Sequence, residues 1–316
     1  MKTIDSELFD AVKSNDITKV KKLISDGADV NACDDNSDAT PLFFADLNIS
    51  EILIKNGADV NARAVNYSTP LHWAPCPEIA ELLIKHGADV NARDKDIRTP
   101  LHYHNRENDG IIKAAETSKI LIQNGADVNA RDGEGMTALH GVVLPEIADV
   151  LIQNGAEVNA RDNDGITPLH LVWYSDIAEC LIKHGADINA RDNNGATPLH
   201  VVKNSEIAGV LIDNGADVNA RSECGSTPLC WAWSAELAEF LISRGADVNT
   251  RDNDGKTPLH RVRNLDVMEL LIKHGADVNA RDNNGKTPLQ WAKILRRPKM
   301  VEWLIEHGAT TENITC

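Results

Sequence analysis

The chain repeats itself, and this repetition limits what it can fold into more than any other feature. The string Gly-Ala-Asp/Glu-Val/Ile-Asn-Ala/Thr occurs nine times, and Thr-Pro-Leu-His or a close variant also occurs nine times. From Thr137 to Thr287 the second string returns every 30 residues. Such fixed periods are typical of repeat arrays, in which neighbouring units bury each other's apolar faces. The 316 residues are therefore expected to form one array of ten helix pairs rather than two globular domains.

Each part of the unit has a physical explanation, and residues 167–185 show it. Thr167 can cap a short first helix whose first residue is proline, where a missing N–H costs nothing. A second helix begins near Asp176, because an acid is favoured at the positive end of the helix dipole. Gly185 supplies the left-handed residue that ends this helix. The Asp-Asn-Asp-Gly strings at 162–165 and 252–255 predict turns between units.

With these motifs the chain resembles the ankyrin repeat family, whose units carry T-P-L-H, then G-A-D-V-N-A, then a D-x-x-G turn. The resemblance covers roughly residues 5–309. It implies an all-α solenoid of stacked antiparallel helix pairs with projecting hairpin-like loops. It also implies that one or more partner proteins bind the concave face, formed by loop tips and first helices. Catalytic residues, metals and cofactors are not expected.

Most internal units are shorter than the family's usual length of about 33 residues. Thr167 to Gly185 spans 18 steps, whereas Thr287 to Gly308 spans 21, the usual family distance. The missing residues fall between the two helices, so the first helices are expected to be trimmed by about one turn. The full-length end segments, residues 1–27 and 287–316, are expected to cap the internal repeats at 28–286, which carry an insertion near 104–112.

Ten of the eleven histidines belong to the repeat pattern, and hydrogen-bonded structural roles are expected for them. His104 stands outside the pattern, beside the insertion, and is the candidate base if the chain is an enzyme. Six histidines end a T-P-L-H string: His72, His102, His140, His170, His200 and His260. Four precede a helix-ending glycine: His86, His184, His274 and His307.

The asparagine of each G-A-D-V-N-A string allows two interpretations. The resemblance matches Asn61, Asn189 and Asn279 to the position that asparaginyl hydroxylases modify in similar ankyrin arrays. The structural alternative is a side chain that braces its own turn. We favour the structural role, and hydroxylation stays open beside it.

Partner-binding residues are sought where the chain departs from its own template. Aromatic residues at the ends of first helices resemble positions that the family varies to contact partners, and exposed Trp and Tyr are enriched in binding hot spots. Basic residues occupy equivalent slots near the C-terminus, where residues 251–316 carry 11 basic and 9 acidic side chains. An acidic partner segment is therefore expected at that end of the concave face. The predicted partner-binding residues are Tyr67, Trp173, Tyr174, Lys203, Trp233, Lys256, Arg263, Lys286 and Lys293.

Composition limits the location and the alternative functions. The formal net charge of −16 disfavours nucleic-acid binding across the whole surface, and no apolar run approaches the roughly 18 residues of a membrane span. Six irregularly spaced cysteines and an N-terminus without a signal-peptide pattern favour the cytoplasm, of the cell of origin or of a host. A monomer is expected. Two alternatives stay open: an enzyme that uses His104 and the 104–112 insertion, or a nucleic-acid binder that uses the C-terminal basic cluster.

Overall fold

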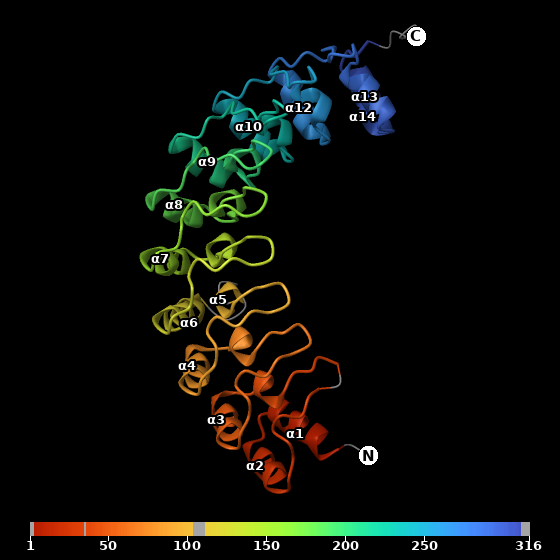
Figure 1. Cartoon of the computed structure of the whole chain (residues 1–316). Coiled ribbons are helices and arrows are strands. Elements are labelled where there is room, and N and C mark those ends of the chain that lie inside the picture. The colour runs from red at the N-terminus through yellow and green to blue at the C-terminus, as the bar shows by residue number, and fades with distance from the viewer. Residues whose placement is uncertain (1–2, 35, 104–110, 311–316) are drawn as a thin grey trace. The chain divides into compact units, whose positions relative to one another are not determined.

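The computed structural model describes residues 3–34, 36–103 and 111–310, and within these ranges every regular element is a helix (Figure 1). Contacts divide the chain into two compact parts, the N-terminal half (residues 1–163) and the C-terminal half (residues 164–316). The described residues form ten pairs of a first and a second helix. This arrangement confirms the predicted all-α repeat fold.

The N-terminal half contains five of these pairs, arranged in two layers. Its first helices stack in the order α1 (Ile4–Lys13), η1 (Pro41–Phe44), η2 (Pro70–Trp73), α5 (Pro100–Tyr103) and η4 (Ala138–Gly141). Its second helices stack in the order α2 (Ile17–Ser25), α3 (Leu47–Lys55), α4 (Pro77–Lys85), α6 (Ile111–Gln123) and α7 (Pro145–Gln153).

The C-terminal half repeats the arrangement with another five pairs. Its first helices stack in the order η5 (Pro168–Leu171), η6 (Pro198–His200), η7 (Pro228–Trp231), α11 (Pro258–Arg261) and α13 (Pro288–Ile294). Its second helices are α8 (Ser175–Lys183), α9 (Ser205–Asp213), α10 (Ala235–Ser243), α12 (Leu265–Lys273) and α14 (Pro298–Glu306). In Figure 1 the hairpin loops of this half project on the side of the first helices.

The first helices of the internal repeats span only three or four residues, whereas α1 has ten and α13 has seven. In the repeat that begins at Thr167, η5 ends at Leu171 and Val172 already has extended backbone, with φ −62° and ψ 137°. The chain therefore turns toward α8 after a single helical turn. This confirms the predicted trimming, while capping by the two end segments stays a prediction.

Aliphatic side chains build the core of both layers. The leucine of the T-P-L-H string is at most 1% exposed in each half, as at Leu71 and Leu169, and Ile177 and Leu181 of α8 are fully buried. Burying a side chain of this size stabilises a fold by about 1.5–3 kcal/mol. Repetition of these positions gives each repeat an apolar surface that only its neighbours can cover.

The Asp-x-x-Gly strings form the predicted turns between repeats. The Asp252 carboxylate accepts hydrogen bonds from the backbone N–H groups of Asp254 at 2.9 Å and Lys256 at 2.8 Å. Gly255 supplies a left-handed residue with φ +77°. The Asn253 N–H donates to the Cys224 carbonyl at 2.9 Å, which ties each hairpin tip to the preceding one. The hairpins are therefore held by a continuous set of backbone bonds within each half.

Candidate protein-binding surface

The T-P-L-H histidines are buried bridges between neighbouring repeats. In all six, Nδ1 accepts a hydrogen bond from the backbone N–H of the helix-capping threonine. In His200 the opposite nitrogen, Nε2, lies 3.1 Å from the Ser226 carbonyl oxygen of the next repeat. A carbonyl can only accept, so Nε2 carries the proton and the ring is neutral. Burial lowers the pKa of His200, and it lowers the pKa of His102 and His260 in the same way. The expected structural role is confirmed, whereas His104 lies outside the described residues.

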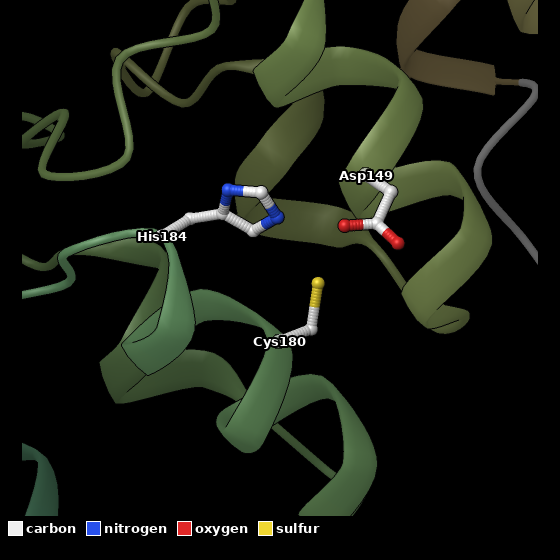
Figure 2. A group of neighbouring side chains, drawn as sticks. All are labelled: Asp149, Cys180 and His184. Carbon is white, nitrogen blue, oxygen red and sulfur yellow. The ribbon is translucent and has the colours of Figure 1, made fainter.

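The histidines before helix-ending glycines cap second helices. His184 caps α8, and its backbone N–H donates to the Cys180 carbonyl at 3.2 Å. Figure 2 shows the side chains of His184 and Cys180 one turn apart on the same side of α8, and it also labels Asp149 of α7, in the N-terminal half. At the last helix, His307 stacks on Trp303 with ring centroids 3.7 Å apart. Their places at helix ends are those expected of repeat-borne residues.

The asparagines join successive repeats, which corrects the prediction that each braces its own turn. Asn61 Nδ2 donates to the carbonyl of the next repeat's helix-ending glycine at 2.9 Å, and its Oδ1 accepts from the Asp89 N–H at 2.8 Å. The turn is braced instead by Asp59, whose carboxylate accepts from the Asn61 N–H. Asn189 and Asn279 make the same pair of bonds. Hydroxylation of these residues stays a prediction.

Trp173, Tyr174 and Trp233 lie in the turns between first and second helices, and not at the ends of first helices as the sequence predicted. The trimming causes the difference, because the shortened helix ends before these positions are reached. All three side chains are exposed, Trp173 to 60% and Trp233 to 62%. Tyr67 is also exposed, at a hairpin tip of the N-terminal half.

In the C-terminal half, adjacent repeats bring aromatic and basic residues together. The Lys203 ammonium lies 5.0 Å from the ring centroid of Trp173. Two repeats further on, Trp233 and Arg263 line a hollow of about 420 Å³ together with Trp231 and Arg261. Within the described part of the chain, neither Lys203 nor Arg263 has a carboxylate within 4.0 Å. These two cations are therefore available to a binding partner.

The two predicted lysines at hairpin tips have contacts of their own. Lys256 and Lys286 are half-buried, and their ammonium groups lie 4.4 and 5.2 Å from the ring centroid of Trp291. Lys256 also lies 3.2 Å from a carboxylate oxygen of Asp254. Lys293, on α13, is exposed. Lys256 therefore offers a partner less net charge than the sequence indicated.

The C-terminal basic cluster, which consists of basic residues within 251–316, is partly neutralised as well. The Arg261 guanidinium donates through Nε at 2.7 Å to Asp252, whose side chain is fully buried. A buried, hydrogen-bonded partner of this kind holds the arginine far more firmly than a surface ion pair. This contact weakens the nucleic-acid alternative, which needs several free cations on one face.

Sequence reasoning missed an exposed apolar cluster in the N-terminal half. Trp73 is half-exposed, and Phe44, Val65 and Ile97 are exposed as well. The available signal was the turn sequence, since Val65 and Ile97 are apolar residues in turns where other repeats carry polar residues and glycine.

Stacked helix pairs joined by repeat-to-repeat hydrogen bonds define a helical repeat protein. A family model for ankyrin repeats (three copies) matches residues 8–94, 76–162, 141–222, 202–282 and 229–315, so the chain belongs to the ankyrin repeat family. Ankyrin repeats are typically protein–protein interaction modules and generally non-catalytic. A comparison with curated proteins finds no match. None of the described helices is long and apolar enough to cross a membrane.

Proposed function

We propose that the chain is a monomeric, non-catalytic binding array whose C-terminal half binds an acidic segment of a partner protein. The observation that carries this proposal is the occurrence of exposed tryptophans beside cations without carboxylate partners in neighbouring repeats. Trp173 lies under Lys203, and Trp233 shares a hollow with Arg263.

The two residue types contribute in different ways. A tryptophan that becomes fully covered at the centre of an interface can be worth about 2 kcal/mol or more. Lysine and arginine add attraction over longer distances, which accelerates encounter and selects an acidic partner. The cation–π contact orients the Lys203 ammonium above the Trp173 ring before binding, so less side-chain entropy is lost. Aromatic anchors beside available cations thus favour a segment that mixes apolar and acidic residues.

A random peptide library selected on the immobilised chain supplies the probe for a direct test. The most acidic selected peptide is labelled, and its affinity is measured by fluorescence polarisation. Replacing Trp173 and Trp233 together with alanine should weaken binding by at least about tenfold, because two central anchors are lost. Lys203→Glu combined with Arg263→Glu should weaken it similarly and reduce its dependence on salt.

Trp73→Ala is the matched control, since it removes an exposed tryptophan of the N-terminal half. It should leave the affinity for the acidic peptide unchanged. Unchanged affinity in the Trp173/Trp233 variant, or a selection without acidic peptides, would contradict the proposed surface. An RNA gel shift that weakens steeply with salt would instead support the nucleic-acid alternative. Sedimentation velocity tests the proposed monomeric state.

A further inference from the structure

A second hollow lies in the N-terminal half, between the hairpin segments 37–39 and 64–68, and its lining carries no charge. Its volume is about 570 Å³, which lies within the range of clefts that hold a small ligand or a few side chains. Three of the lining residues are small and polar. The apolar lining residues are Ala39, Phe43, Phe44, Ala64, Val65 and Trp73.

The large side chains of this hollow are exposed but held in place. Trp73 is 51% exposed, its indole N–H donates to the Ser68 hydroxyl at 2.8 Å, and its ring meets Tyr103 edge-on at 5.1 Å. Val65 is 61% exposed, and its backbone N–H donates to the Ser37 carbonyl at 2.8 Å. Exposed apolar residues that are gathered and fixed in this way are typical of binding sites, since little freedom remains to be lost.

The hairpin tips beside the hollow keep large side chains at a backbone conformation that disfavours them. Tyr67 has φ +62° and Ile97 has φ +65°, both two residues before the helix-capping threonine. The corresponding residue in a later repeat is Gly135, with φ +81°. Left-handed backbone costs a β-branched or bulky residue roughly 1–2 kcal/mol. Retaining Tyr67 and Ile97 at this cost points to a use for their exposed side chains.

The charges around the hollow indicate which partner it fits. Residues 3–73 contain 12 acidic and 6 basic side chains, and the hairpin that contributes segment 37–39 to the hollow carries Asp34 and the exposed Asp38. The protein's own Lys13 places its ammonium 4.5 Å from the Phe44 ring centroid and 3.8 Å from the Asp34 carboxylate. At the edge of the hollow, the Phe44 ring and the Asp34 carboxylate therefore bind a cation together.

We propose that this hollow binds an apolar segment of a partner protein that also carries lysine or arginine. The uncharged lining takes the apolar side chains, and the acidic surroundings attract basic residues and repel acidic ones. The inference goes beyond the proposed function, because the C-terminal half is assigned a partner segment of the opposite charge.

The test is a selection from a random peptide library on the full chain, with Val65→Asp and Trp73→Ala variants as comparison targets. Peptides retained by the wild type and lost by both variants should be rich in large apolar residues and in Lys or Arg. A labelled peptide of this set should bind the wild type at least about tenfold more tightly than either variant. Val65→Asp keeps the test valid if Trp73→Ala alters the fold, since Val65 contributes little to the core.

The Trp173→Ala/Trp233→Ala variant is the control and should bind this peptide as the wild type does. Three results would overturn the proposal. The first is a set of selected peptides that is acidic or purely polar. The second is an affinity that does not change when Val65 or Trp73 is replaced. The third is a dimer in sedimentation that Val65→Asp dissociates, which would assign the hollow to a second copy of the chain. If the Trp173→Ala/Trp233→Ala variant loses only the acidic peptide, that result supports the C-terminal surface independently of the N-terminal hollow.

Discussion

The slot that follows Thr-Pro-Leu-x holds a tryptophan in both halves, but its surroundings differ. In the N-terminal half, Trp73 lies edge-on to Tyr103 and donates to the Ser68 hydroxyl. In the C-terminal half, Trp291 faces two lysine ammonium groups and donates to the Asp282 carboxylate at 2.8 Å. The same backbone position is thus part of an apolar cluster in one half and of a charged cluster in the other.

This difference shows that the scaffold and the surface can vary independently. The scaffold is held by threonine–histidine pairs, asparagine bridges and aspartate-capped hairpins, which recur in both halves. None of these bonds uses the side chains of the exposed aromatic and basic positions. Those positions are therefore free to acquire different binding chemistry, and the following variants test that separation.

Removing a bridging histidine should destabilise both halves strongly and to a similar extent. His72→Ala in the N-terminal half and His200→Ala in the C-terminal half each delete a buried ring with bonds to its own threonine and to the next repeat. We expect a loss of about 2–4 kcal/mol in each case, from unpaired buried groups and a cavity. Urea denaturation measures the loss in the free energy of unfolding. The surface control Arg263→Ala should change this free energy by no more than about 0.5 kcal/mol from the wild-type value. A large loss in only one half would show that the scaffold is not shared.

Replacing a capping threonine with valine should change the stability of the protein in opposite directions at two positions. Thr40 is 4% exposed and its hydroxyl has no hydrogen-bond partner among the described residues, since Phe43 occupies the histidine slot. Thr197 instead has its hydroxyl 3.0 Å from Nδ1 of His200. Thr40→Val should therefore stabilise the protein by about 1 kcal/mol, and Thr197→Val should destabilise it by about 1–2 kcal/mol. Denaturation midpoints that shift in the same direction would contradict the view that the Thr40 hydroxyl lacks a hydrogen bond and the Thr197 hydroxyl makes one.

Acidification should weaken the scaffold in both halves. Burial lowers the pKa of His102 in the N-terminal half and of His200 and His260 in the C-terminal half. The unfolded chain, with a histidine pKa of about 6.5, then binds protons more readily than the folded chain, so stability is complete above about pH 6.5 and falls as pH drops below it. Amide hydrogen exchange across this range should show earlier loss of protection around the three histidines. A His200→Gln variant with an unchanged pH profile in its repeat would contradict this cause.

The smallest single effect is expected for Ile97→Gly, a substitution at a hairpin tip. Ile97→Gly should stabilise the N-terminal half by about 0.5 kcal/mol, because relief of left-handed strain slightly exceeds the entropy cost of glycine. Gly225 is the equivalent residue in the C-terminal half, and Gly225→Ala adds a side chain there. This substitution should destabilise the C-terminal half by more than about 1 kcal/mol, because the added Cβ would lie 2.5 Å from the Asn253 side-chain oxygen. Thermal denaturation distinguishes the two. A loss of stability in Ile97→Gly would remove the argument that Ile97 is retained for binding.

The sequence predicted most of the features that lie within one repeat and failed chiefly where two repeats meet. Thr197 and His200 are three residues apart, so their bond follows from local helix geometry. Asn61 bonds to a residue 28 positions away, a distance that only the stacking of repeats makes short. The apolar hollow likewise joins Phe44 to Trp73 from successive repeats. The positions of Lys256 and Lys286 over Trp291 depend on side-chain packing, which motif spacing does not encode.

The most direct test of two distinct binding surfaces is a crossed affinity measurement with the acidic and the basic selected peptides. Each labelled peptide is titrated with the wild type, the Trp173→Ala/Trp233→Ala variant and the Val65→Asp variant. We predict that the first variant loses at least about tenfold affinity for the acidic peptide alone, and that the second loses as much for the basic apolar peptide alone. Loss of both peptides in the same variant, or of neither in both, would contradict separate surfaces on a shared scaffold.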